Sequence, residues 1–125
     1  MAENQLSDTH FWLGIRTTHR YDCYMRICDV ARLLDIRELD INNVYKSILS
    51  SDQYVWVDNQ GRGMDYESLG WEVAINYEGI IKLVQHLGLQ KNDVIENLYS
   101  TYMEEAYNSG KITRETYLQH VSSKR

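Results

Sequence analysis

The sequence has no run of about 18 apolar residues, so it contains no candidate for a transmembrane helix. Its first ten residues, MAENQLSDTH, are polar and acidic and lack the apolar core of a signal peptide. We therefore expect the protein to remain in the cytoplasm where it is made. Residues 1–9 are expected to be disordered or loosely attached.

Motifs for metal or nucleotide binding are also missing. The only cysteines, Cys23 and Cys28, form a C-x4-C pair without a second pair, which makes a poor zinc site. The four histidines are scattered, and the turn Gly61-Arg62-Gly63 is only G-x-G, far short of a phosphate-binding loop. We therefore expect no metal and no cofactor.

The sequence also carries no excess of positive charge. The net charge is −5, whereas nucleic-acid binders usually carry a basic face, because phosphate contacts supply much of their affinity. The sequence also contains no proline, and it has ten tyrosines against one phenylalanine. Tyrosine offers a large amphipathic surface with little side-chain entropy to lose, so protein interfaces favour it.

The pattern of apolar residues predicts one α+β domain over residues 10–125. The run Tyr54–Val57 consists of β formers, and Trp71, Val73 and Ile75 alternate with less apolar residues, as in a half-buried strand. The domain would be a small antiparallel sheet covered by short helices (10–88), followed by a helical extension (89–125). Strands are predicted at 11–15, 23–27, 54–57 and 71–75, and helices at 30–36, 41–49, 77–87, 92–107 and 113–122.

Capping residues set the expected ends of these helices. Asp29, Asn76, Asn92 and Thr113 each precede a helical pattern and can accept a hydrogen bond from an unpaired N–H of the first turn. Gly88 is expected to end the third helix.

Cys28 is the one residue that suggests catalysis. It lies at a predicted helix start, where the helix dipole would lower a thiol pKa. A small buried cysteine that packs beneath the helix is the simpler interpretation. We therefore predict that the protein is not an enzyme, and keep an enzyme using Cys28 as an open alternative.

The helices predicted at 30–36 and 41–49 suggest a helix–turn–helix. Its second helix would present Asn42, Asn43 and Lys46 to a major groove, where asparagine can bind adenine and lysine can bind guanine or phosphate. Two short helices joined by a short connector also occur in many folds that never contact DNA. A DNA-binding transcription regulator is therefore the alternative function.

The long segment from Asp58 to Gly70 lies between two predicted strands and exceeds the length of a tight hairpin. Loops of this length often carry function. We expect it to be mobile in the free protein and to contact a partner through Arg62, Met64 and Tyr66.

Two short phrases resemble the BRO-N domain of phage antirepressors and related viral proteins. One is the D-V-A-x-x-L phrase that begins at Asp29, and the other is Ile75-Asn76-Tyr77-Glu78-Gly79-Ile80-Ile81-Lys82-Leu83. In the second phrase the asparagine suits a helix cap and the glycine a close approach. The resemblance covers residues 27–88 and implies phage regulation in a bacterial host, by contact with a repressor or with DNA, and it brings no catalytic residues.

The last two predicted helices carry more apolar surface than one small domain needs. The stripe on 92–107 includes Leu98 and Tyr102, and Tyr117, Leu118 and Val121 add a further patch. Large uncovered apolar patches are rare on monomers. We therefore expect a homodimer through residues 92–122 with Leu98 and Tyr102 near its centre. In the alternative, the last helix covers the stripe and the protein is a monomer.

These observations favour a small, non-enzymatic, viral-type regulatory or inhibitor protein that acts by protein–protein binding. The partner would be a repressor or a host defence protein. An acidic, tyrosine-rich surface suits binding to a basic partner.

Overall fold

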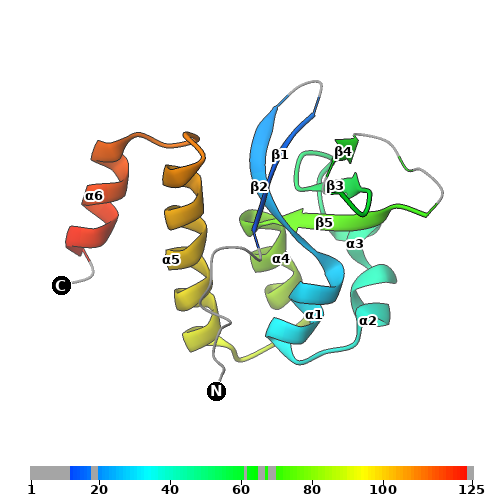
Figure 1. Cartoon of the computed structure of the whole chain (residues 1–125). Coiled ribbons are helices and arrows are strands. Elements are labelled where there is room, and N and C mark those ends of the chain that lie inside the picture. Colours follow the sequence, from blue (N-terminus) through cyan, green and yellow to red (C-terminus); the bar gives the residue numbers. More distant parts are fainter. Residues whose placement is uncertain (1–11, 18–19, 61, 65–66, 68–69, 124–125) are drawn as a thin grey trace, which may run out of the picture.

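The computed structural model of the protein describes residues 12–17, 20–60, 62–64, 67 and 70–123 (Figure 1). The prediction for residues 1–9 lies outside this part of the chain. The α+β prediction is confirmed. The strands are β1 (Leu13–Arg16), β2 (Tyr21–Arg26), β3 (Tyr54–Val57), β4 (Gly63–Met64) and β5 (Glu72–Asn76). The helices are α1 (Ile27–Leu34), α2 (Glu38–Asn42), α3 (Tyr45–Ile48), α4 (Tyr77–Leu87), α5 (Asn92–Asn108) and α6 (Arg114–Ser123).

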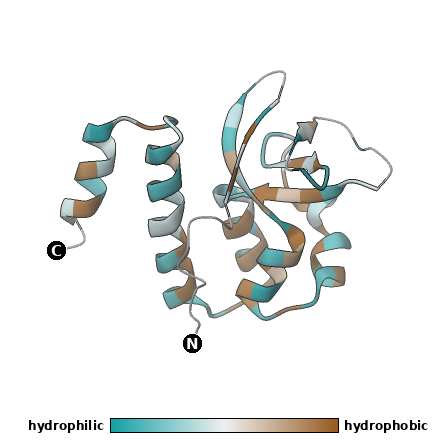
Figure 2. Cartoon of the chain, in the orientation of Figure 1, coloured by the Kyte–Doolittle hydropathy of each residue, from teal (hydrophilic) through white to brown (hydrophobic). Residues whose placement is uncertain are grey.

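The strands form one antiparallel sheet in the order β1-β2-β5-β3-β4. Alternation along β5 sends Val73 and Ile75 into the main core under the helices, as predicted, and Ala74 to the opposite face. Figure 2 shows hydrophobic residues along β5 and on α1 and α4, whereas α5 and α6 are more mixed. The main core therefore lies between the sheet and its helices.

The opposite face of the sheet has a small core of its own, made by Ile15, Tyr24, Val55, Val57 and Ala74. The sheet curls around this small core, so that Gly63 on edge strand β4 lies against Ile15 on edge strand β1. A Cβ atom at position 63 would overlap the Cγ2 atom of Ile15. Glycine is thus required there by close approach.

The first helix begins earlier than predicted. It starts at Ile27, directly after β2, and its N-cap residue Arg26 makes no side-chain cap hydrogen bond. Asp29, which was expected to be the cap, lies in the first turn and pairs with Arg32 at 3.5 Å. Ile27 is buried and extends the apolar face of the helix, so packing decides where this helix begins.

The prediction of a single helix at 41–49 is wrong, because the structure has two short helices there, α2 and α3. The Asp40 carboxylate accepts hydrogen bonds from the Arg37 backbone N–H at 3.3 Å and from the Arg37 guanidinium at 2.9 Å, and α2 starts at Glu38. The helical path is interrupted at Asn43 and Val44 before α3. The apolar positions still face the core: Ile41, Tyr45 and Leu49 are all buried. The spacing thus predicted the buried face correctly but not the continuity of the helix.

The junction of β5 and α4 follows the sequence closely. The Asn76 side chain accepts a hydrogen bond from the Gly79 N–H at 2.9 Å, which confirms the cap. A Cβ atom on Gly79 would lie 3.0 Å from the Gln53 carbonyl oxygen, which confirms the close approach. Gly88 ends α4 in the left-handed conformation at φ 67°, as expected.

The C-terminal helices form the extension (Figure 1). Helix α5 packs on α4 and β2, while α6 packs on α5 at the outer edge. The expected cap of α5 is wrong, because Asn92 is the first helical residue and Lys91 holds the cap position without a side-chain hydrogen bond. The cap of α6 is confirmed, since Thr113 Oγ1 accepts from the Thr116 N–H at 3.2 Å. No helix within the described residues is long and apolar enough to span a bilayer.

Candidate binding pocket

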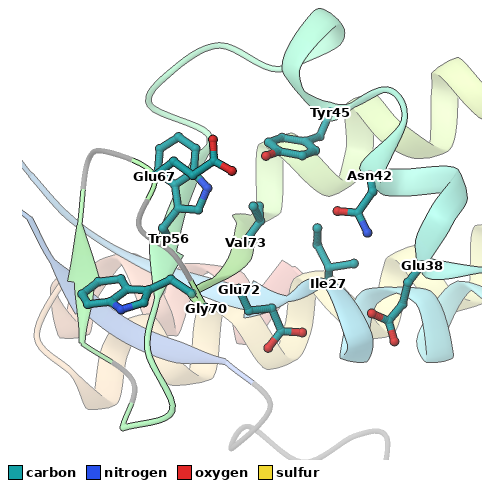
Figure 3. A pocket seen from close by; sticks show the side chains of 10 residues that line it. Ile27, Glu38, Asn42, Tyr45, Trp56, Glu67, Gly70, Glu72 and Val73 are labelled. Atoms are coloured by element: carbon teal, nitrogen blue, oxygen red, sulfur yellow. The ribbon is translucent and has the colours of Figure 1, made fainter.

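A cavity of about 400 Å³ opens where α2 and α3 meet the β3–β5 side of the sheet (Figure 3). Its size is within the usual range for small-ligand sites. Side chains from six separate parts of the chain line it: Ile27, Glu38, Asn42, Tyr45, Trp56, Glu67, Gly70, Trp71, Glu72 and Val73. We call this cavity the acidic pocket.

The aromatic wall of the acidic pocket is held rigidly. Tyr54 makes edge-to-face contacts with both Tyr45 and Trp56, with ring centroids 5.1 and 5.4 Å apart. Tyr45 and Trp56 line the cavity but are 5% and 9% exposed, and the Lys46 ammonium lies 6.0 Å from the centroid of the Tyr45 ring. Trp71 is only partly buried. Packed rings of this kind are preorganised for a ligand, because binding costs them little entropy.

The polar lining is acidic. Among the described residues, it includes three glutamates and no lysine or arginine. Glu72 pairs with Arg26 at 3.4 Å and Glu67 pairs with Lys46 at 3.2 Å, whereas Glu38 makes no ion pair with any described residue. In Figure 3, Glu38 and Glu72 lie toward one end of the pocket and Glu67 toward the other.

The Cys28 thiol lies close to two of these glutamates, Glu38 and Glu72. Burial, assisted by the nearby carboxylates of Asp29, Glu72 and Glu38, raises the pKa of Cys28 to about 11. The expectation of a lowered thiol pKa at the helix start is therefore wrong: desolvation and like charge outweigh the helix dipole. Cys28 is a protonated thiol at neutral pH, which is unfavourable for nucleophilic catalysis.

The residues proposed to contact DNA do not share one helix. Asn42 ends α2 and lines the acidic pocket, Asn43 is the exposed C-cap residue of α2, and Lys46 belongs to α3. Lys46 is also partly neutralised by its ion pair with Glu67. The continuous recognition helix on which the DNA hypothesis depended is absent from the described region 38–48.

Part of the long segment after β3 is ordered by its own contacts. The Asp58 carboxylate accepts backbone N–H bonds from Arg62 and Gln60, each at 2.9 Å, and a 2.7 Å bond from Arg62 Nε. These bonds hold the pKa of Asp58 below its ordinary value. Met64 lies in β4 and pairs with Trp56. Tyr66 lies outside the described residues, and the expected mobility and partner contacts of the segment remain predictions.

A second cavity of about 380 Å³ adjoins the acidic pocket. It is lined by Arg26, Val57, Asp58 and Asn59, and it shares Gly70 and Glu72 with the acidic pocket.

The structure places the two proposed dimer residues within the chain's own packing. Leu98 is 2% exposed and belongs to the main core. Tyr102 is half-buried, stacks on Tyr77 with ring centroids 5.6 Å apart and donates a hydrogen bond to Asp22. Much of the α5 stripe is thus covered within one chain, by α4, β2 and Trp12, rather than left for a second copy. The homodimer itself remains a prediction.

Sequence reasoning missed the acidic pocket. Its glutamates lie at positions 38, 67 and 72, and nothing in their spacing along the chain indicates that they meet. The one local signal was Trp71-Glu72 at the start of β5, next to a glycine-containing segment. Within the described parts of the chain, no three His, Cys, Asp or Glu side chains are grouped so that they could hold a metal ion.

Comparison with known proteins gives no relative: no family model, no curated protein and no solved structure matches this chain significantly.

Proposed function

We propose that the protein is a small, non-enzymatic regulatory or inhibitor protein that acts by binding another protein. The observation that carries this proposal is the acidic pocket, a preformed cavity with rigid aromatic walls and three glutamates. Aromatic residues in a partly buried hollow are typical of the energetic centres of protein interfaces. The negative lining selects a positively charged partner surface.

The resemblance of residues 27–88 to the BRO-N domain supports a phage-type role in a bacterial cytoplasm. Within that role, the partner would be a repressor or a host defence protein. Both kinds of protein commonly bind nucleic acid through basic surfaces, and an acidic protein with a net charge of −5 can compete for such a surface.

The competing function is direct DNA binding. The interruption between α2 and α3 and the ion pair of Lys46 with Glu67 both weigh against it. At the same end of the molecule, the glutamates of the acidic pocket would repel phosphate.

Two measurements test the proposal together. Affinity capture from an extract of the source organism, treated with nuclease, should retain a protein partner that binds directly when purified. Fluorescence anisotropy with a random DNA duplex at physiological salt should give a Kd weaker than about 10⁻⁵ M, within the nonspecific range. Submicromolar, salt-sensitive binding to duplex DNA, or a partner that is lost on nuclease treatment, would contradict the proposal.

A further inference from the structure

The acidic pocket combines two features that bind a cation. Aromatic rings attract a cation placed over their faces, and carboxylates supply ion pairs and accept hydrogen bonds. Tyr45, Trp56 and Trp71 provide the rings, and the three glutamates provide the carboxylates. A hollow built only for core packing would not need three carboxylates in its lining.

The charge of the pocket is only partly cancelled from within the protein, because Arg26 pairs with Glu72 at 3.4 Å and Lys46 pairs with Glu67 at 3.2 Å. Glu67 shares its charge with Lys46, but both side chains of this pair are largely exposed to solvent, at 64% and 60%. An exposed pair of this kind is weak, so a better-placed cation can replace it. Glu38 has no ion-pair partner among the described residues, and its carboxylate is available to a ligand.

The shape favours a planar cation on a chain. A guanidinium stacks on aromatic rings and offers five N–H donors in one plane, so it can contact a ring and pair with carboxylates at the same time. An ammonium is a compact, strongly hydrated charge that cannot do both. The adjoining cavity, which shares Gly70 and Glu72, leaves room for the residues on either side of an inserted side chain.

We propose that the acidic pocket receives an arginine side chain from a basic segment of the partner protein. This inference rests on the proposed function and identifies the part of the partner that is recognised. The guanidinium lies against the partly buried ring of Trp71, pairs with Glu38, and replaces Lys46 as the partner of Glu67. The neighbouring cavity holds the adjacent backbone.

The three tryptophans allow a direct test by NMR of the full chain. Trp56 and Trp71 line the acidic pocket, whereas Trp12 is buried and its Nε1–H donates to Thr101 at 3.0 Å. Titration with acetyl-Gly-Arg-Gly-amide should shift the indole signals of Trp56 and Trp71 and leave that of Trp12 in place. The same peptide with lysine should bind several-fold more weakly, and the peptide with citrulline, which is neutral but has the same shape, should cause almost no shift.

Charge variants locate the binding site. Glu38→Gln together with Glu67→Gln should lower the affinity for the arginine peptide by about fivefold, which corresponds to the loss of two exposed ion pairs. Glu104→Gln is the matched control, since Glu104 is an exposed glutamate on α5, away from the pocket, and the peptide should bind this variant as it binds the parent. The Trp12 signal shows in each case that the fold is intact.

The outcomes separate this inference from the proposed function. Equal shifts with arginine and citrulline, an equal loss of affinity in Glu104→Gln, or no shift with any peptide would overturn the arginine pocket. A purified partner that still binds the Glu38→Gln/Glu67→Gln protein at full affinity would also overturn it, while leaving the protein-binding function in place. Failure of the proposed function would appear instead as DNA binding with no direct protein partner.

Discussion

Tyr102 on α5 donates a 2.8 Å hydrogen bond to the Asp22 carboxylate on β2, joining residues that lie 80 positions apart in the sequence. Asp22 also accepts bonds from the Asn76 side chain at 3.1 Å and from the Cys23 N–H at 2.8 Å. One carboxylate therefore links the sheet, the start of α4 and the C-terminal extension. Burial and the charge of Asp22 raise the pKa of Tyr102 far above its ordinary value, so its hydroxyl remains a donor.

Tyr102→Phe should lower the free energy of unfolding by about 1–2 kcal/mol, because it removes a hydrogen bond to a charged, largely buried acceptor. The ring and its contacts remain, so the loss reports the hydroxyl alone. Tyr99→Phe is the control, since Tyr99 is 38% exposed and also packs against Tyr77. Urea denaturation followed by circular dichroism measures both variants. Equal stability of the Tyr102 and Tyr99 variants would show that the bond to Asp22 does not stabilise the fold.

Gly79→Ala should destabilise the protein, although alanine is the better helix former. The new methyl group would meet the Gln53 carbonyl oxygen at 3.0 Å, and that carbonyl is held in place by the Asn76 N–H, also at 3.0 Å. The strain of overpacking, about 1–3 kcal/mol, should exceed the gain in helix propensity of roughly 1 kcal/mol.

The control on the same helix is Lys82→Ala, at an exposed position, which should change stability by less than about 0.5 kcal/mol. Thermal denaturation of both variants at one pH gives the comparison. A Gly79→Ala protein that melts above the parent would contradict the close approach at the junction of β5 and α4.

The parts of the fold that the sequence predicted are those governed by neighbours in the chain. Asn76 and Gly79 lie three residues apart, and the alternation of Trp71, Val73 and Ile75 needs only the pleat of one strand. The break between α2 and α3 was missed because the bonds from Arg37 to the Asp40 carboxylate favour an earlier start, and the apolar spacing alone fits one helix equally well.

The acidic pocket and the Asp22 junction could not be predicted in the same way. Glu38, Glu67 and Glu72 come to line one cavity only once the helices, the strands and the segment between β4 and β5 have folded together. Tyr102 was predicted to lie at a dimer interface, because the apolar stripe on its helix is wide for a single small domain. The structure shows that α4 and β2 cover much of that stripe, and this long-range packing leaves no local pattern in the sequence.

Cys28 should react slowly with iodoacetamide at pH 7.5. Its pKa of about 11, raised from 9.0 by burial and by nearby carboxylates, leaves very little thiolate. The higher nucleophilicity of a more basic thiolate offsets part of this loss, so the rate should be roughly tenfold below that of free cysteine. Peptide mapping by mass spectrometry distinguishes Cys28 from Cys23, which is fully buried and should not react in the folded protein.

The rate at which iodoacetamide alkylates Cys28 should rise with pH up to about 11. The same pKa shift affects folding stability. Because the folded-state pKa lies above the unfolded value, the neutral thiol favours the folded state at pH below about 9, and that contribution is lost as the pH rises toward 11. Rapid, pH-independent labelling of Cys28 near neutrality would show a reactive thiolate instead, and would revive the enzyme hypothesis.

Self-association, if it occurs through residues 92–122, must use surface that the chain itself leaves uncovered. Leu118 on α6 is 46% exposed and Tyr99 on α5 is 38% exposed, whereas Leu98 is 2% exposed and unavailable. We predict a homodimer in light scattering at tens of micromolar, with twice the chain mass of 14.8 kDa. Leu118→Glu should convert it to a folded monomer, because a charge at the centre of an apolar contact cannot be buried without a partner.

Leu39→Glu is the matched control for this experiment. Leu39 is 54% exposed on α2, away from the C-terminal helices, and its replacement should leave the dimer intact. Leu98→Asp should instead unfold the protein, since it buries a carboxylate in the main core. A single species near 14.8 kDa for the parent protein would rule out the dimer and leave α6 as a helix that only covers α5. A dimer that Leu39→Glu disrupts and Leu118→Glu does not would place the contact on α2 instead.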